Sequence, residues 1–179
     1  MSELLVIPED EMTAEIDQAI RELLCACFPP DVSTFSVTRA WHNSAPAYSL
    51  IARQAQRIVG HVGVVIREIS CGETPVRVAG IQNLAVAPDQ RSRGIGPRLM
   101  TAAMIEANQR AIPFGLLFCI PELERYYRQL DWMRIDVQST MLDATQGIVP
   151  IPGKNIVMVL PLADQSWPPG DIYLQGMDW

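Results

Sequence analysis

The segment "LAVAPDQRSRGIGPRLMTAA", Leu84 to Ala103, decides the fold. Its first residues, "LAVAP", are apolar and typical of the end of a strand, and the residues after "QRSRGIGPRL" are helix formers. The Gly- and Arg-rich loop between them therefore lies at a helix N-terminus. Unpaired backbone N–H groups and the helix macrodipole favour an anion at such a place.

The side chains of the loop fit the same interpretation. Gly94 and Gly96 let the backbone approach a ligand, while Arg91, Arg93 and Arg98 add donors for phosphate oxygens. The loop is not a P-loop, because no G-x-x-x-x-G-K-[ST] pattern and no Lys occurs in this region. The sequence predicts an anion site here, and the alternative is a solvated basic turn that caps the helix.

Strands and helices alternate around the loop. Apolar spacing predicts a helix over Ala14–Phe28, ended by two prolines, and a hairpin follows after a polar linker. A strand–helix–strand unit centred on the loop is expected to be parallel. The order of these helices and strands predicts an α/β fold, with a mixed sheet as in α+β proteins. The expected strands are 48–54, 57–70, 75–88, 113–120, 139–144 and 155–163, and the expected later helices are 96–111 and 121–132.

Composition bounds the function classes. The 179 residues are 49% hydrophobic with a net charge of −6, which favours one globular domain and argues against a nucleic-acid partner. The acidic N-terminus does not resemble a signal peptide, and no apolar run approaches a membrane span. The cysteines and histidines lack zinc spacing, so we expect no metal and reduced thiols in a cytoplasmic protein.

The loop and its context resemble the acetyl-CoA-binding segment of the GNAT superfamily of N-acetyltransferases. The family has an apolar-Ala-Val strand, then [RQ]-x-x-G-x-[GA], then a helix, and Arg91, Gly94 and Gly96 match these motif positions. The resemblance implies a GNAT-like acyl-CoA N-acyltransferase fold, with a central splayed mixed sheet flanked by helices, as a single domain over 1–179. It implies acetyl-CoA as co-substrate, with the pyrophosphate on the loop backbone and the pantetheine arm paired to the strand edge. The cofactor-binding residues so implied are Leu84, Ala85, Val86, Arg91, Ser92, Arg93, Gly94, Ile95 and Gly96.

Direct acyl transfer needs a neutral amine, an oxyanion stabiliser and a proton donor for the departing thiolate. In "ERYYRQLDW" the residue that matches the family's Tyr general acid is Tyr127, although this chain has Asp131 where the family places a Gly. Packing aromatics are the alternative for both tyrosines. His61, in the middle of an apolar strand, is a candidate general base, and the alternatives are a satisfied core histidine and a water chain that ends at a carboxylate.

Two branches look closer than generic GNAT members, and both act on amino sugars. The aminoglycoside 2'-N-acetyltransferases and the NodA-type N-acyltransferases share a strand like "VMVLPLA" and a late Trp element like "WPPGDIY". By position, Asp31, Gln82 and Asp171 are the implied acceptor-binding residues, with Gln82 where the aminoglycoside branch has a Glu. Solvated loop acids are the alternative for both aspartates. We expect residues 163–179 to form a strap over the acceptor side, or one over the core.

The function predicted from these residues is transfer of an acetyl group from acetyl-CoA to a primary amine, an amino sugar being one candidate, by direct attack in a ternary complex. The alternatives are a NodA-type enzyme for longer acyl chains and a catalytically degenerate acyl-CoA-binding regulator. The sequence leaves open the acceptor, the acyl length, the base and the oligomeric state, with a homodimer as one option.

Overall fold

The computed structural model describes residues 2–151 and 156–179, and these form two compact units. Unit 1 comprises the described residues up to Val65 together with Gln82–Ala103, and unit 2 comprises those of Ile66–Ile81 and Met104–Trp179. Three elements pass from one unit into the other along the chain. They are the strands β3 (Arg57–Cys71) and β4 (Thr74–Val86) and the helix α3 (Ile95–Gln109).

The sheet of unit 1 is antiparallel and begins at the N-terminus. The strand β1 (Glu3–Pro8) pairs with β2 (Tyr48–Gln54), which pairs in turn with β3. Leu50 in β2 lies between Val6 of β1 and Val62 of β3 in this register. The hairpin between β2 and β3 is the one that the sequence predicts.

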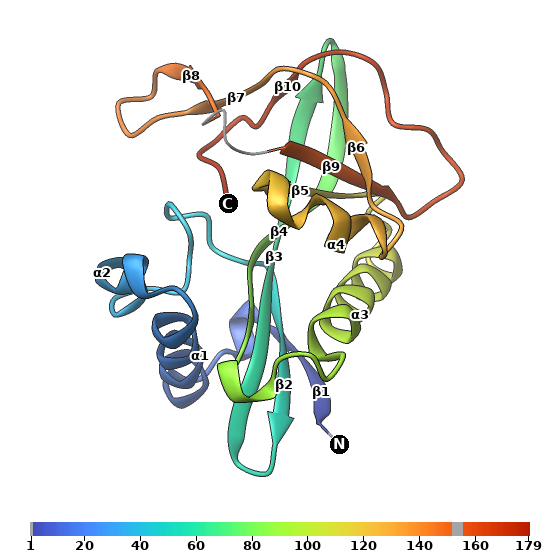
Figure 1. The fold of residues 1–179 in the computed structure, drawn as a ribbon. Coiled ribbons are helices and arrows are strands. Elements are labelled where there is room, and N and C mark those ends of the chain that lie inside the picture. Colours follow the sequence, from blue (N-terminus) through green and yellow to red (C-terminus); the bar gives the residue numbers. More distant parts are fainter. Residues whose placement is uncertain (1, 152–155) are drawn as a thin grey trace. The chain divides into compact units, whose positions relative to one another are not determined.

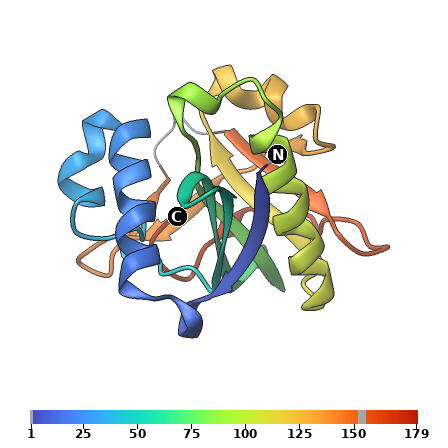
Figure 2. The same cartoon turned by 90° about the horizontal axis from the view of Figure 1, so that it is seen from below.

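Helices cover both faces of this sheet. The helix α1 (Ala14–Cys27) begins at Thr13, whose hydroxyl accepts from the Ile16 N–H, and buries Ile20 and Leu24. It stands with the short helix α2 (Val32–Phe35) on one face, whereas α3 stands on the other (Figures 1 and 2). Gly60 of β3 makes the close approach of α3 possible. A Cβ there would lie 2.9 Å from side-chain carbons of both Ile95 and Leu99. Single 3₁₀ turns, η1 to η3, occupy Glu9–Glu11, Pro29–Asp31 and Pro88–Gln90.

Unit 2 is built on the remaining strands. The strand β5 (Phe114–Cys119) lies between β4 and β9 (Ile156–Pro161), and β6 (Met133–Ile135) pairs with β9. On the other side, β3 pairs with β10 (Ile172–Tyr173). The strands β10, β7 (Ser139–Leu142) and β8 (Ile148–Pro150) complete this side in that order. The turn η4 (Pro121–Leu123) leads into the helix α4 (Glu124–Arg128).

The pairing of β4 with β5 confirms the predicted parallel unit. The ladder joins Val78–Gly80 to Phe114–Leu116 in parallel, whereas the β5–β9 ladder is antiparallel, so the sheet is mixed. Both β4 and β5 continue beyond the residues of their short ladder, β4 as far as Val86 and β5 as far as Cys119. The fold that the GNAT resemblance implies has a splayed pair of strands at this place.

The predicted elements differ from the observed ones mainly at their ends. The helix expected over 121–132 is a 3₁₀ turn and a short α-helix that ends at Arg128. The strand expected over 155–163 begins at Ile156, since Asn155 lies outside the described residues. The strands β1, β6, β8 and β10 were not expected. Nothing in the fold tests the prediction that residues 1–179 are one domain.

Candidate functional site

The arginine loop of unit 1 connects the end of β4 to the start of α3. Arg91, Ser92, Arg93 and Gly94 are exposed, whereas Ile95 is buried beneath them. Ser92 and Gly94 have φ angles of +61° and +74°, in the left-handed region. Apart from Gly94 and its two chain neighbours, no atom of the described residues lies within 4 Å of the place where a Cβ of Gly94 would stand. The backbone conformation, and not crowding, therefore explains this glycine.

The first N–H groups of α3 have no acceptor among the described residues. In the contacts of the described residues, the N–H groups of Gly94, Ile95 and Gly96 donate to no protein acceptor. Pro97 has no N–H, and the first helical bond runs from the Arg98 N–H to the Gly94 carbonyl at 3.3 Å. Such a row of free donors at the positive end of a helix of this length attracts an anion.

A cavity of about 160 Å³ lies beside the loop in unit 1. Arg93 and Arg98 both line it, so the cavity wall carries positive charge. Arg98 is held in place there, because its guanidinium donates to the carbonyl and the hydroxyl of Ser2 at 3.0 Å. The sequence did not point to the polar side chains that complete the lining, which are Ser2, Gln54 and Gln90.

The Arg91 side chain is directed back to the protein. Its Nε donates to the Val86 carbonyl at 3.2 Å, and the thiol of Cys27 donates to the same oxygen at 3.4 Å. Burial raises the pKa of this thiol, so it remains protonated at neutral pH. Arg91 thus fixes the end of β4, and the backbone of the loop is the part that faces outward.

The strand segment that leads into the loop alternates in burial. Leu84 and Val86 are half-buried, whereas Ala85 between them is buried. Asn83, just before them, has a φ angle of +54°, which is rare for a residue inside a strand. The polar groups around Asn83 hold it there.

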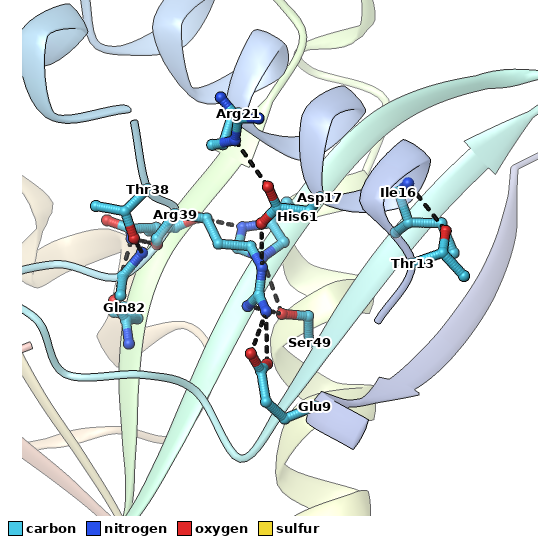
Figure 3. Close-up of polar contacts among 12 residues, drawn as sticks. Glu9, Thr13, Ile16, Asp17, Arg21, Thr38, Arg39, Ser49, His61 and Gln82 are labelled. Carbon is cyan, nitrogen blue, oxygen red and sulfur yellow. Dashed lines mark hydrogen bonds and ion pairs between the residues drawn. The ribbon is translucent and has the colours of Figure 1, made fainter. Parts of the chain in front are cut away.

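A buried polar network lies in unit 1, next to the residues of β4 that belong to this unit (Figure 3). Arg39, 5% exposed, forms ion pairs with Glu9 and Asp17, and its Nη1 lies 3.4 Å from the Ser49 hydroxyl. That hydroxyl lies 3.2 Å from Nε2 of His61. A buried guanidinium with two carboxylate partners satisfies the rule that charges inside a protein are paired.

His61, the candidate base, is completely buried. Its Nδ1 lies 3.1 Å from the Asn83 carbonyl and its Nε2 contacts Ser49, so both ring nitrogens have partners. Burial lowers the pKa of His61 to about 4, and the positive charge of Arg39 adds to this effect. The ring is therefore neutral at neutral pH.

The predicted acceptor residues differ in what their side chains do. Gln82 is 3% exposed, and its amide accepts from the Trp41 N–H at 2.8 Å and donates to the Ser44 carbonyl at 2.7 Å. Asp171, in unit 2, accepts from the Gln138 N–H at 3.1 Å. Asp31 is half-buried, and its carboxylate makes no hydrogen bond with the described residues.

Tyr127, the candidate acid, lies in α4 of unit 2. The residue is 7% exposed, and its ring packs edge-on against Tyr126 and Trp132, with ring centroids 5.0 and 6.3 Å away. Burial raises the pKa of Tyr127 well above its usual value, so the phenol keeps its proton at neutral pH. Among the described residues the hydroxyl makes no hydrogen bond. Tyr126, the neighbouring tyrosine, is only half-buried.

Asp131, the residue before Trp132, lies in the turn that follows α4. Asp131 has a φ angle of +65°, the conformation that a Gly adopts without strain. The N–H groups of Leu130 and Trp132 both donate to the Tyr127 carbonyl, at 2.9 and 3.2 Å. The turn expected from a Gly at this position therefore forms with Asp131.

The late segment 163–179 packs within unit 2. Trp167 contacts Phe114 edge-on at 5.1 Å, and the ring of Trp179 lies directly over Gly80 of β4. The guanidinium of Arg67 stands 5.0 Å from the Trp179 ring centroid. A strap over the core is thus present, while its place over an acceptor stays a prediction.

Among the described residues, no group of three or more His, Cys, Asp or Glu side chains is arranged to hold a metal ion. Cys25, Cys27, Cys71 and Cys119 are free thiols. Of the helices in the described ranges, none has both the length and the apolar character to span a membrane.

Known proteins resemble this chain in sequence. The family model for nodulation protein A (NodA) matches residues 6–175. A nodulation protein A of Bradyrhizobium elkanii is 29% identical over 151 residues, covering 77% of this chain and 70% of the relative. One from a Mesorhizobium species is 27% identical over 161 residues, covering 79% and 77%.

Solved structures resemble it in fold. A GNAT family N-acetyltransferase (YhbS) of Escherichia coli in complex with CoA superposes with a TM-score of 0.72. Its sequence identity is 16%, and the match covers 97% of this chain and 89% of that one. A GNAT family acetyltransferase of Brucella melitensis in complex with acetyl-CoA gives 0.64 at 17% identity, covering 95% and 94%. These matches confirm the predicted GNAT-like fold.

Of the two branches that the sequence suggested, the NodA branch has a family model that matches nearly the whole chain. The predictions of the fold class and of an acyltransferase are both confirmed. This chain belongs to the nodulation protein A (NodA) family, and it is an acyltransferase with the GNAT fold.

Proposed function

We propose that this protein transfers an acyl group from acyl-CoA to the primary amine of a small molecule, by direct attack in a ternary complex. The observation that carries the proposal is the row of free N–H groups at Gly94, Ile95 and Gly96, next to a cavity lined by Arg93 and Arg98. Those donors suit the pyrophosphate of CoA. The solved GNAT structures with CoA or acetyl-CoA support the same ligand.

The residues from Leu84 to Val86 bind the pantetheine arm in this proposal, as an added strand on the edge of β4. The short β4–β5 ladder supports this role, because β4 continues beyond it. The loop residues Arg91–Gly96 then hold the phosphates mainly through their backbone.

Tyr127 is the proposed general acid for the CoA thiolate. The assignment rests on the resemblance to GNAT enzymes, and a protonated phenol without a hydrogen-bond partner supports it. A regulator that only binds acyl-CoA would not need such a donor, so we favour an enzyme over a degenerate binder.

An amino sugar is the proposed acceptor, with Asp31 as the residue to contact its ammonium or hydroxyl groups. The Asp31 carboxylate has no hydrogen bond to lose among the described residues, unlike the carboxylate of Asp171 and the amide of Gln82. Residues 163–179 are proposed as the strap on the acceptor side, by resemblance to the two branches that act on amino sugars.

The donor chain length separates two versions of the proposal. Acetyl-CoA is the donor that the GNAT resemblance implies, whereas the NodA family match favours a longer acyl chain. Isothermal titration with CoA, acetyl-CoA and palmitoyl-CoA would compare them, because a donor whose acyl group is accommodated binds at least as tightly as CoA. Binding of none of the three would overturn the proposed function.

Turnover is tested by release of free CoA thiol over a panel of amines that includes glucosamine, an aminoglycoside and lysine. We expect wild-type protein to release CoA thiol with an amino sugar. Tyr127→Phe should lower this rate of release at least about 100-fold, as is typical for loss of a general acid. Full activity of Tyr127→Phe would refute the role of this residue. Arg125→Gln, an exposed substitution in the same helix, is the matched control.

A further inference from the structure

We infer that His61 is a positioning residue, which holds the left-handed residue Asn83 and so sets the course of the strand segment Leu84–Val86. The inference rests on the proposed function, in which this segment binds acyl-CoA. It assigns His61 a task different from that of a general base. His61 belongs to the buried polar network of unit 1 (Figure 3).

The partners of His61 determine which nitrogen carries its proton. The Asn83 carbonyl can only accept, so the Nδ1 that lies 3.1 Å from it must donate. In a neutral ring Nε2 is then an acceptor, and the Ser49 hydroxyl, 3.2 Å away, donates to it. With the proton on Nδ1, a neutral His61 therefore makes both hydrogen bonds, accepting from Ser49 and donating to Asn83.

Arg39 determines the direction in which the Ser49 hydroxyl donates. Its Nη1 donates to the Ser49 oxygen at 3.4 Å, which leaves the hydroxyl hydrogen of Ser49 free to point at His61. A guanidinium can only donate, so Ser49 cannot direct its own hydrogen toward Arg39. The lone pair of His61 Nε2 is thus used by Ser49 in a fully buried place, where an amine has no access.

Asn83 is the residue on which these contacts act. A left-handed non-glycine residue inside a strand is costly, and it persists where its surroundings fix it. The Asn83 side chain donates to the Arg39 carbonyl at 2.8 Å and to the Gln82 amide oxygen at 3.1 Å, while His61 holds the Asn83 carbonyl. Hydrogen bonds therefore fix both the side chain and the carbonyl group of Asn83, directly before Leu84.

Two substitutions of His61 separate its two hydrogen bonds. The amide nitrogen of an asparagine occupies about the place of Nδ1, so His61→Asn can still donate to the Asn83 carbonyl. The amide of a glutamine reaches the place of Nε2, so His61→Gln keeps only the contact with Ser49. The titration compares their dissociation constants for CoA with those of wild type and His61→Leu.

We expect CoA to bind about 10-fold more weakly to His61→Leu and His61→Gln, as for loss of one buried hydrogen bond, and within about threefold of wild type to His61→Asn. Val62→Ala is the control, because this neighbour in β3 is equally buried but points to the opposite face. Equal weakening by the Asn and Gln variants would overturn the inference. If His61→Leu does not fold, the Asn and Gln variants alone decide.

A thermal cycle tests the link without any ligand. Asn83→Gly adopts the left-handed conformation without strain, so it no longer needs the bond from His61. We expect His61→Leu to lower the melting temperature by at least about 3 °C in the wild-type background and by clearly less in the Asn83→Gly background. Equal losses in the two backgrounds would refute the link. If wild-type protein does not bind CoA, the proposed function fails while this cycle still tests His61.

Discussion

Single residues in this protein carry out tasks that their types do not reveal. His61 is buried with a pKa of about 4, below its usual 6.5, so between these pH values the unfolded chain binds a proton that the folded chain does not. Stability that is present above pH 6.5 is therefore lost as the pH falls toward 4. Among the described residues, Arg39 is the charged group that acts on the ring, and its own partners are Glu9 and Asp17.

A pH comparison follows from that sign. For wild-type protein, His61 should lower the free energy of unfolding by about 2 kcal/mol between pH 7 and pH 5. In His61→Asn this contribution disappears, so the two pH values should differ less. Urea unfolding at both pH values measures the difference. A loss of stability equal in the two proteins would contradict a neutral, buried His61.

Asp131 offers a second test at this scale. With a φ angle of +65°, it is tolerated in the turn before Trp132, because Asp reaches the left-handed region at moderate cost. A β-branched residue does not, so Asp131→Val should destabilise the fold by about 1–2 kcal/mol, whereas Asp131→Gly should be neutral or stabilising. Thermal unfolding of both variants provides the measurement. Equal melting temperatures would mean that the turn relaxes to another conformation.

At the scale of residues, the sequence indicated the unusual backbone conformation of Gly94 but not the roles of several buried polar residues. The surrounding motif indicated that position 94 needs a glycine. The left-handed Asn83 and the buried Arg39 were not indicated, since each depends on partners far away in the chain. The use of Gln82 to hold the turn at Trp41 and Ser44 was hidden for the same reason.

At the scale of elements, the backbone conformation of the loop before α3 provides a test of the proposed CoA binding. Gly94 has room for a side chain but a φ angle of +74°. Gly94→Ala should therefore lower the melting temperature by at most about 2–4 °C and weaken CoA binding about 5- to 10-fold, because about 1 kcal/mol or more opposes the left-handed conformation and the loop of the variant relaxes away from it.

Ser92→Gly is the matched control for this variant, since Ser92 shares the left-handed conformation and glycine relieves its strain. Titration with CoA should give Ser92→Gly an affinity within about twofold of wild type. If Gly94→Ala bound CoA as tightly as wild type, the loop backbone would not be the phosphate ligand.

The strand β4 shows a second dependence on glycine. A Cβ at Gly80 would stand 2.1 Å from the Trp179 ring, so Gly80→Ala forces the ring to move. We expect it to cost about 1–3 kcal/mol, as overpacking does. In the Trp179→Ala background the same change should cost much less, because the ring is absent. Chemical denaturation of the four proteins gives the coupling, and additive costs would exclude this contact.

Element order was the most predictable part of the structure. Long apolar or periodic segments such as β3, β4 and α3 have a strong local signal. The strand β10 is two residues long and exists only through its pairing with β3 and β7. Pairing of that kind joins distant segments, so no local pattern contains it.

At the scale of the whole molecule, the NodA family match and the GNAT fold make the chain an acyltransferase, while its division into two units raises the question of cooperativity. The strands β3 and β4 and the helix α3 each contribute residues to both units. A unit that unfolded alone would have to break all three elements in their middle. We therefore expect one transition, as a single domain over 1–179 requires.

Tryptophan placement makes this prediction testable. Trp41 lies in unit 1, and Trp132, Trp167 and Trp179 lie in unit 2, so in Trp41→Phe the tryptophan fluorescence reports on unit 2 alone. Leu24→Ala in α1 of unit 1 removes a fully buried side chain and should cost about 2–5 kcal/mol. In the Trp41→Phe background it should lower the midpoint of the unit 2 fluorescence transition as much as Leu117→Ala in β5 of equal cost does. An unchanged midpoint would show that the units unfold independently and that the chain is not one cooperative domain.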